Sequence, residues 1–428
     1  MTMRPSYRST GTLLSALLLS LLLALPGLLS AAPQTLLIED DEGVELPVSV
    51  YPAEGEHLIL WLLPQQGERP AHAALAKALN RLDIEVWQVD LLDAHFLART
   101  NDNMRDLNGV SVASLLRAAH QKTGKQVMIV ASGRPAITAL RGMRQWQRDG
   151  PDSDYVLGTA LYFPNLMQAT PVAGEQAIYV DEAYASNLPV LLMQPEFGVY
   201  RWHLEEIIAI LQQGGAPVFS QLIGGVRDFY YLRRNDPEPE ERLAQDAIPA
   251  QLQRAARLFA RLERPLQATA LPQTKAAEVS TRRGLVRLDG SRQATPIALP
   301  DQLGKQHQLK DYDGNVILLN FWASWCPPCV EEIPSMNRMA ETLGEGFAIV
   351  SVNFQEDAAH IQDFMRQVQV DFPVLMDSDG RVSAEWKVFA FPSSFILDRQ
   401  GRLRYSVNSA IDWEEPEVLD AVRGLMAE

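Results

Sequence analysis

Residues 320–334 read "NFWASWCPPCVEEIP" and contain the only two cysteines of the 428-residue chain. A strand-like apolar run, "NVILLNFWAS" (315–324), leads into them, and a helix-like run, "PCVEEIPSMNRMAETLG" (328–344), follows. Cys326 is therefore expected at the N-terminus of a helix, where unpaired backbone N–H groups and the helix dipole stabilise a thiolate. Cys329 is expected one turn further along, close enough for a disulfide and more shielded from solvent.

The spacing of the two cysteines favours a reactive pair over a structural cross-link. A loop of four residues restricts the unfolded chain very little, so a disulfide there would add little stability. Half of a zinc site is a second alternative, but structural zinc needs four ligands. No third cysteine exists, and the nearest histidines, His307 and His360, show no paired spacing. We therefore predict no metal site.

The sequence around the motif predicts a small α/β domain from about residue 286 to residue 428. Before the motif, residues 295–312 suggest a short hairpin that turns near Gly304. After it, the pattern predicts a strand (346–354), a helix (358–370), a hairpin that turns near Gly401 (392–407) and a closing helix (415–428).

Three segments together carry a resemblance to a known family. "FWASWCPPC" (321–329), with "LKDYDGNVILLN" (309–320) before it and "FPSSFILDRQG" (391–401) after it, resembles the thioredoxin superfamily. More narrowly, it resembles the exported thiol–disulfide oxidoreductases of the TlpA/ResA kind, over about residues 292–427. The resemblance implies a thioredoxin fold in which Cys326 attacks a substrate disulfide and Cys329 resolves the mixed disulfide. The Cys326–Cys329 disulfide is then the redox-active group, and no other cofactor is needed.

The same resemblance assigns roles to residues beyond the cysteines. Pro392, after Phe391, matches the cis-proline that helps to dock an extended substrate, and Trp325 and Phe391 are expected to form the substrate surface. Glu332 matches the acid of the pattern C-x-x-C-x-x-E-x-P, which assists proton transfer, and Pro334 matches the proline that kinks the helix. Pro392 could instead be an ordinary loop proline, and Glu332 could be a solvated acid in the first turn of the helix. For Glu331 we prefer the interpretation as a solvated acid.

One position departs from thioredoxin itself. Thioredoxin carries a buried Asp six residues before its first cysteine, whereas this chain has Asn320 there. An Asn side chain cannot accept the proton released when Cys329 becomes a nucleophile. Our hypothesis is that Glu332 accepts it instead.

Residues 33–263 predict a second α/β domain, joined to the first by a Pro- and Ala-rich linker at 264–285. Short apolar strands alternate with helices, which indicates a mainly parallel sheet covered on both faces. Strands are expected at 57–63, 84–92, 126–131, 158–163, 188–194 and 217–224, and helices at 71–82, 111–125, 136–146 and 250–263.

Within this region, "QVMIVASGRPAITAL" (126–140) has the strand–turn–helix pattern of a nucleophile elbow, with Ser132 at the turn. The domain therefore resembles the α/β-hydrolase fold, although both glycines of the elbow are missing. Glu196 or Asp228 could supply the acid, but no histidine follows the last strand, and His203 is better explained as a helix-surface residue. Without a base, Ser132 is a poor nucleophile, so we predict a non-catalytic domain that binds a peptide, a glycan or a protein partner.

The N-terminus predicts export. Arg4 and Arg8 precede an apolar run from Leu13 to Leu29, and small residues follow, which is the layout of a signal peptide over residues 1–32. The run is also just long enough for an uncleaved membrane anchor. A periplasmic location is expected, either soluble or anchored. The net charge of −15 disfavours nucleic acid as a partner.

Three hypotheses of function follow. The first is an exported thiol–disulfide oxidoreductase that reduces disulfides in proteins, with a membrane electron donor of the DsbD/CcdA kind and substrates such as the apocytochrome c thiols of cytochrome c maturation, all implied by the resemblance. The second is a binding or scaffold protein whose thioredoxin domain is a redox sensor. The third is a serine hydrolase that uses Ser132.

Overall fold

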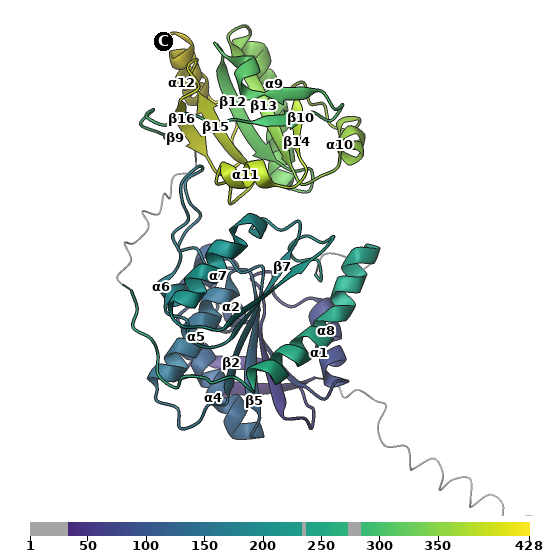
Figure 1. Ribbon diagram of the computed structural model, residues 1–428, viewed down its shortest axis with the longest axis vertical. Coiled ribbons are helices and arrows are strands. Elements are labelled where there is room, and N and C mark those ends of the chain that lie inside the picture. Colours follow the sequence, from purple (N-terminus) through teal and green to yellow (C-terminus); the bar gives the residue numbers. More distant parts are fainter. Residues whose placement is uncertain (1–32, 233–236, 273–283) are drawn as a thin grey trace, which may run out of the picture.

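The computed structural model describes residues 33–232, 237–272 and 284–428, which form two α/β domains, each built around one large sheet (Figure 1). The expected export segment at 1–32 lies outside the described residues, and so does much of the expected linker. Within these described ranges, no helix has the length and apolar character needed to span a membrane.

The N-terminal domain contains a mixed sheet of eight strands. In sheet order they are β1 (Gln34–Glu39), β2 (Glu45–Tyr51), β4 (Glu85–Val89), β3 (His57–Leu62), β5 (Gln126–Ser132), β6 (Val156–Tyr162), β7 (Val190–Pro195) and β8 (Val218–Ile223). The pairs from β4 to β8 are parallel, as expected. The antiparallel pairing of β1 with β2, and of β2 with β4, was not predicted.

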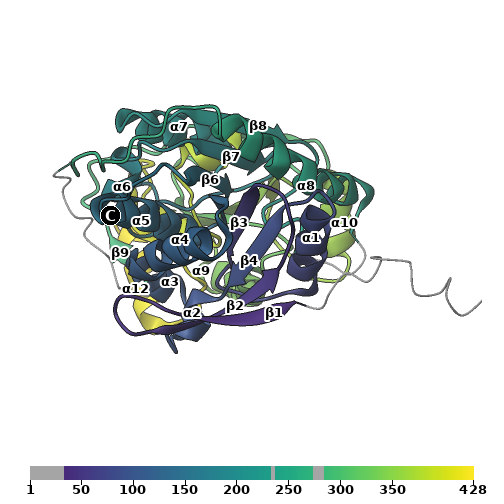
Figure 2. The same ribbon diagram turned by 90° about the horizontal axis from the view of Figure 1, so that it is seen from below.

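Helices cover both faces of this sheet because the strands are apolar on both sides. Along β3, Leu58, Leu60 and Leu62 enter one core, whereas Ile59 and Trp61 enter the other. Figure 2 shows α1 (Pro70–Asn80) and α8 (Pro239–Phe259) on one side of the strands and α4 (Val110–Thr123) and α5 (Pro135–Arg148) on the other. The remaining helical segments are α2 (Leu91–Ala94), α3 (Asn101–Asp106), α6 (Asp181–Tyr184), η1 (Arg201–His203) and α7 (Leu204–Gln213).

Two predicted boundaries in this domain were wrong. The last helix was expected to begin at residue 250, but α8 begins at Pro239, within the charged segment. Proline is well suited to the first helical position. The side chain of Glu241 accepts a hydrogen bond from the backbone N–H of Glu238, the residue before the helix. The strand expected to reach residue 92 ends at Val89. There, Asp90 caps α2 by accepting a hydrogen bond from the Asp93 N–H at 3.2 Å.

The C-terminal domain has a sheet of six strands flanked by helices. In sheet order the strands are β14 (Val374–Asp377), β13 (Phe347–Phe354), β12 (Val316–Trp322), β15 (Ser393–Leu397), β16 (Leu403–Val407) and β9 (Val286–Arg287). The helical segments are η2 (Leu309–Tyr312), α9 (Pro327–Leu343), α10 (Ala358–Met365), α11 (Arg381–Glu385) and α12 (Pro416–Met426), and β10 (Ala298–Pro300) pairs with β11 (Gln306–Gln308) in the predicted hairpin. α10 ends five residues before the predicted end at 370, and β14 and α11 were not predicted.

The two domains pack against each other. Phe389 of the C-terminal domain lies in the apolar core of the N-terminal domain, with its ring centroid 4.5 Å from that of His203. Trp202 Nε1 donates a hydrogen bond to the Asp379 carbonyl at 2.8 Å. Neither contact could be predicted, because residues of separate domains share no periodicity along the chain.

Candidate active site

The two cysteines lie at the junction of β12 and α9 and are joined by a disulfide, with Cα atoms 5.3 Å apart. Cys326 is the residue that precedes the first turn of α9, and Cys329 lies within that turn. Cys326 is 6% exposed and Cys329 is 1% exposed. The structure therefore places the cysteines at the helix N-terminus, with the second one more shielded, as expected.

The prolines between the cysteines limit one expected interaction. Pro327 and Pro328 occupy the first two positions of α9 and have no backbone N–H. The next N–H group, that of Cys329, donates to the Cys326 carbonyl at 3.0 Å. A Cys326 thiolate therefore gains less from unpaired N–H groups than the sequence analysis assumed, and its stabilisation depends more on the dipole of the 17-residue helix.

Glu332 is buried, at 3% exposed, so the alternative of a solvated acid is wrong for this residue, whereas Glu331 is exposed. Asn320 Nδ2 donates to Glu332 Oε1 at 2.8 Å and to Ser394 Oγ at 2.9 Å, and Trp413 Nε1 donates to Glu332 Oε2 at 3.2 Å. Burial raises the pKa of Glu332 to about 7, although these hydrogen bonds oppose the rise. Asn320 thus positions Glu332, the residue that we expected to replace the missing Asp.

The Phe391–Pro392 peptide bond is cis. Beside it, the Phe391 ring packs edge-on against Trp325 at a centroid distance of 5.9 Å, and it packs in a tilted arrangement against Phe354 at 4.7 Å. Trp325 is 39% exposed, which is unusual for so large an apolar side chain. The structure thus brings together Pro392, Phe391 and Trp325, which the sequence analysis assigned to substrate docking.

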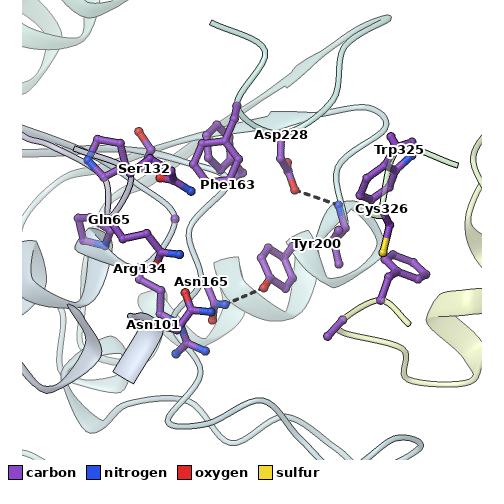
Figure 3. Close-up of a pocket in the computed structure, with 18 of the residues that line it drawn as sticks. Gln65, Asn101, Ser132, Arg134, Phe163, Asn165, Tyr200, Asp228, Trp325 and Cys326 are labelled. Atoms are coloured by element: carbon purple, nitrogen blue, oxygen red, sulfur yellow. Dashed lines mark hydrogen bonds between the residues drawn. The ribbon is translucent and has the colours of Figure 1, made fainter. Parts of the chain in front are cut away.

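These residues form one wall of a cavity of about 460 Å³ between the two domains. The other wall is formed by segments that follow β3, β4, β5, β6, β7 and β8 of the N-terminal domain, at the edge where open α/β sheets bind ligands. Figure 3 shows Ser132 on one side of this space and Cys326 on the other. The lining comprises residues 64–66, 101, 132–135, 163, 165, 199, 200, 228 and 229 of the N-terminal domain and residues 325–328, 390 and 391 of the C-terminal domain.

The comparisons with known proteins concern the C-terminal domain. The model of the AhpC/TSA family matches residues 291–406. Over 119 residues, the chain is 33% identical to the thioredoxin-like protein YneN of Bacillus subtilis (strain 168), which covers 27% of this chain and 69% of that protein. Thiol-disulfide oxidoreductase ResA of Bacillus thuringiensis subsp. konkukian is 31% identical over 118 residues, or 27% of this chain and 68% of ResA. Through this domain, the chain belongs to the ResA-like thioredoxin family.

A solved structure also resembles this ResA-like domain. It is a crystal structure from Chlorobium tepidum, described as a thiol:disulfide interchange protein DsbE. It is 32% identical and covers 33% of this chain and 96% of its own chain, with a TM-score of 0.29.

One residue that supports the ResA-like site was missed by the sequence analysis. Glu356 is buried, and it accepts hydrogen bonds from the Ser324 N–H at 2.7 Å, the Ser324 hydroxyl at 2.6 Å and Asn353 Nδ2 at 2.7 Å. It thereby fixes the loop that leads from β12 to Cys326. Its position directly after β13 was the available signal, because neighbouring parallel strands end at the same edge of a sheet.

Ser132 ends β5 and precedes Gly133, whose φ of +65° forms the sharp turn into α5. Its side chain is fully buried and its hydroxyl hydrogen-bonds to the Tyr231 hydroxyl, not to a histidine. Burial raises the pKa of Tyr231, so this phenol stays protonated and cannot act as a base at neutral pH. His203 contacts Phe389, and Glu196 Oε2 accepts a hydrogen bond from the backbone N–H of Gly225 at 2.8 Å.

Proposed function

We propose that the chain is an exported thiol–disulfide oxidoreductase that reduces disulfides through Cys326 and Cys329. The observation that carries this proposal is the position of the disulfide: Cys326 faces a cavity at the N-terminus of α9, and Cys329 lies behind it. Similarity to ResA thiol-disulfide oxidoreductases supports the same chemistry. Protein disulfides are the substrates implied by this resemblance.

The reaction transfers two electrons from the dithiol to the substrate. The Cys326 thiolate attacks one sulfur of the substrate disulfide, which forms a mixed disulfide and releases one substrate thiolate. The Cys329 thiolate then attacks the Cys326 sulfur, which forms the Cys326–Cys329 disulfide and releases the second substrate thiolate. Each released thiolate takes up a proton. Glu332 is the proposed acceptor of the Cys329 proton, because its pKa of about 7 makes it a competent base near neutral pH.

The compartment and the electron source belong to the same proposal. The apolar run at 13–29 and the basic residues before it support export to the periplasm, with the segment either cleaved or retained as an anchor. Thiols in that compartment become oxidised unless a donor supplies electrons. The proposed donor is a membrane protein of the DsbD/CcdA kind.

Repeated turnover tests the proposal against the redox-sensor alternative. With dithiothreitol as electron donor, we expect the full chain to reduce many insulin disulfides per molecule, well above the rate of dithiothreitol alone. The measurement is the turbidity of the released insulin B chain. A protein that accepts or gives electrons once and then stops would be a sensor and would contradict the proposal.

The N-terminal domain is part of the proposal as a non-catalytic domain on the α/β-hydrolase plan. Its parallel strands, and the strand–turn–helix at Ser132, support the plan. The hydrogen bond between Ser132 and a protonated Tyr231 supports the absence of serine catalysis, because neither group can remove the hydroxyl proton.

Labelling of Ser132 tests the proposal that the N-terminal domain is non-catalytic. We expect no stoichiometric modification of the full chain by a fluorophosphonate probe, and we expect Ser132→Ala to reduce insulin at the wild-type rate. Mass spectrometry of the probe-treated protein measures the first expectation. A single adduct on Ser132 would instead establish the serine hydrolase alternative.

A further inference from the structure

The cavity between the domains has two chemically different walls. Around Cys326 the lining is apolar, with the rings of Trp325 and Phe391 and the prolines at 327 and 328. The opposite wall is rich in hydrogen-bond donors, as Figure 3 shows, and includes Gln65, Asn101, Arg134, Asn165 and Tyr200. A small site with an apolar surface and a few polar groups is the usual form of a ligand-binding pocket.

Arg134 is the cation in this lining, and it is 6% exposed. Its Nη1 donates to the Met167 carbonyl at 2.8 Å, while its Nε is buried and has no hydrogen-bond partner. No carboxylate in the described part of the chain forms a salt bridge with Arg134. A buried charge is costly unless it is paired, so a guanidinium held in this way is suited to an anion that enters the cavity.

Two neighbouring features favour an anion at the same place. Asn165 Nδ2 donates to the Tyr200 hydroxyl at 2.7 Å, and burial raises the pKa of Tyr200, so its O–H proton is retained. No residue described by the structure accepts that proton, which leaves it available to a ligand. Arg134 also stands at the N-terminus of α5, a helix of 14 residues whose dipole attracts negative charge.

We propose that the cavity binds a disulfide substrate that carries a carboxylate, with the carboxylate at Arg134 and Tyr200 and the disulfide at Cys326. This inference rests on the proposed reductase function and names the class of its substrate. Asp228, the acid of the lining, lies near both Tyr200 and Trp325 in Figure 3 and contributes to the raised pKa of Tyr200. It disfavours a carboxylate on that side of the phenol, so Arg134 is the main partner of the substrate carboxylate. The carboxylate belongs either to a small disulfide or to an acidic residue beside a cysteine in a peptide.

The proposed reduction needs no reagent besides the substrate disulfide and the protein dithiol. The carboxylate stays unchanged at Arg134 while the Cys326 thiolate displaces one sulfur of the substrate, and Cys329 then displaces the other. The substrate disulfide is the oxidant, the protein dithiol is the reductant, and two substrate thiols are the products.

The test measures single-turnover oxidation of the pre-reduced full chain, so that no donor is present. The probes are 4,4′-dithiodibutyrate and its diamide, which are similar in size, the diamide having neutral amides in place of the carboxylates. The rates are followed by tryptophan fluorescence. Each rate is divided by that of free dithiothreitol with the same probe. We expect the normalised rate to be at least about tenfold higher for the carboxylate, which is the scale of a charge-assisted hydrogen-bond pair.

Three variants test whether Arg134 causes the preference for the carboxylate probe over its diamide. Arg134→Gln should bring the ratio of carboxylate to diamide close to one. Arg148→Gln removes the same charge from an exposed position of α5 and should keep the wild-type ratio. Because Arg134 is buried and its replacement can perturb folding, Asn101→Asp adds a negative charge at an exposed residue of the lining, and it should lower the ratio several-fold.

A second pair of probes, peptide disulfides with Glu or Gln beside the cysteine, separates the two sources of the carboxylate. A charge preference confined to the peptides assigns the site to protein substrates, and one confined to dithiodibutyrate assigns it to small disulfides. Equal normalised rates for both members of both pairs would overturn the inference while leaving the reductase function intact. If no disulfide oxidises the reduced chain, the proposed function itself fails.

Discussion

Cys329→Ser is expected to stop after half a reaction and to accumulate a mixed disulfide between Cys326 and the substrate. Cys326 faces the cavity and Cys329 lies behind it, so a substrate meets Cys326 first, and only Cys329 is placed to release the product. Turnover of insulin disulfides should fall by at least roughly 10³-fold, because both sulfurs are needed for a complete cycle. Mass spectrometry of the full chain purified from its host without reductant measures the adduct.

Cys326→Ser is the matched control. It should lose turnover to the same degree and form no adduct, because Cys329 is only 1% exposed and cannot reach a substrate in this arrangement. Equal amounts of the same adducts on both variants would show that Cys329 also acts as a nucleophile and would contradict the assigned order. The mass of the adduct on Cys329→Ser also tells whether the natural substrate is a protein or a small molecule.

Much of the C-terminal domain could be predicted because its sequence signals are local. The strand before the motif, the helix after it and the two hairpins lie within a few residues of their predicted positions, since apolar periodicity and glycine turns determine them. The cysteines and Glu332 follow from spacing along a single helix. The burial of these side chains could not be predicted from spacing, and it is burial that raises the pKa of Glu332 to about 7.

The cavity could not be predicted, because its two walls come from parts of the chain about 190 residues apart, such as Ser132 and Cys326. The sequence analysis identified Ser132 as a possible nucleophile but did not single out Arg134, two residues further along the chain. Its importance depends on burial without an acidic partner, and this is a property of the folded domain. Interdomain contacts such as Phe389 against His203 likewise have no local signature.

Glu332 is expected to make the C-terminal domain less stable as pH rises. Burial raises the pKa of its carboxyl from an ordinary value of 4.5 to about 7, so between these values the folded state holds a proton that the unfolded state has released. Its contribution is therefore fully present below about pH 4.5 and is lost as pH approaches 7. The total change in the free energy of unfolding is about 3 kcal/mol.

Glu332→Gln should remove this decline, because an amide does not titrate. The amide has one acceptor oxygen in place of two, so it leaves either the Trp413 N–H or the Asn320 amide without an acceptor and lowers the overall stability. The measurement is the free energy of opening of α9 from hydrogen exchange between pH 5 and pH 8, corrected for intrinsic exchange rates, on the disulfide form so that the cysteines do not titrate. The exposed neighbour provides a control, since Glu331→Gln should keep the wild-type slope. Parallel slopes for wild type and Glu332→Gln would place the pKa of Glu332 near its ordinary value.

The same substitution should also slow the second half of the reaction. If Glu332 accepts the proton of Cys329, Glu332→Gln lowers the rate of mixed-disulfide resolution by roughly 10²-fold, the usual contribution of a general base. The rate in the wild type should rise with an apparent pKa near 7, and this rise should disappear in the variant. Attack by Cys326 on the substrate should change little, because Glu332 is buried behind the cysteines. An unchanged pH profile for resolution would leave Glu332 as a structural residue, held by Asn320 and Trp413 for packing alone.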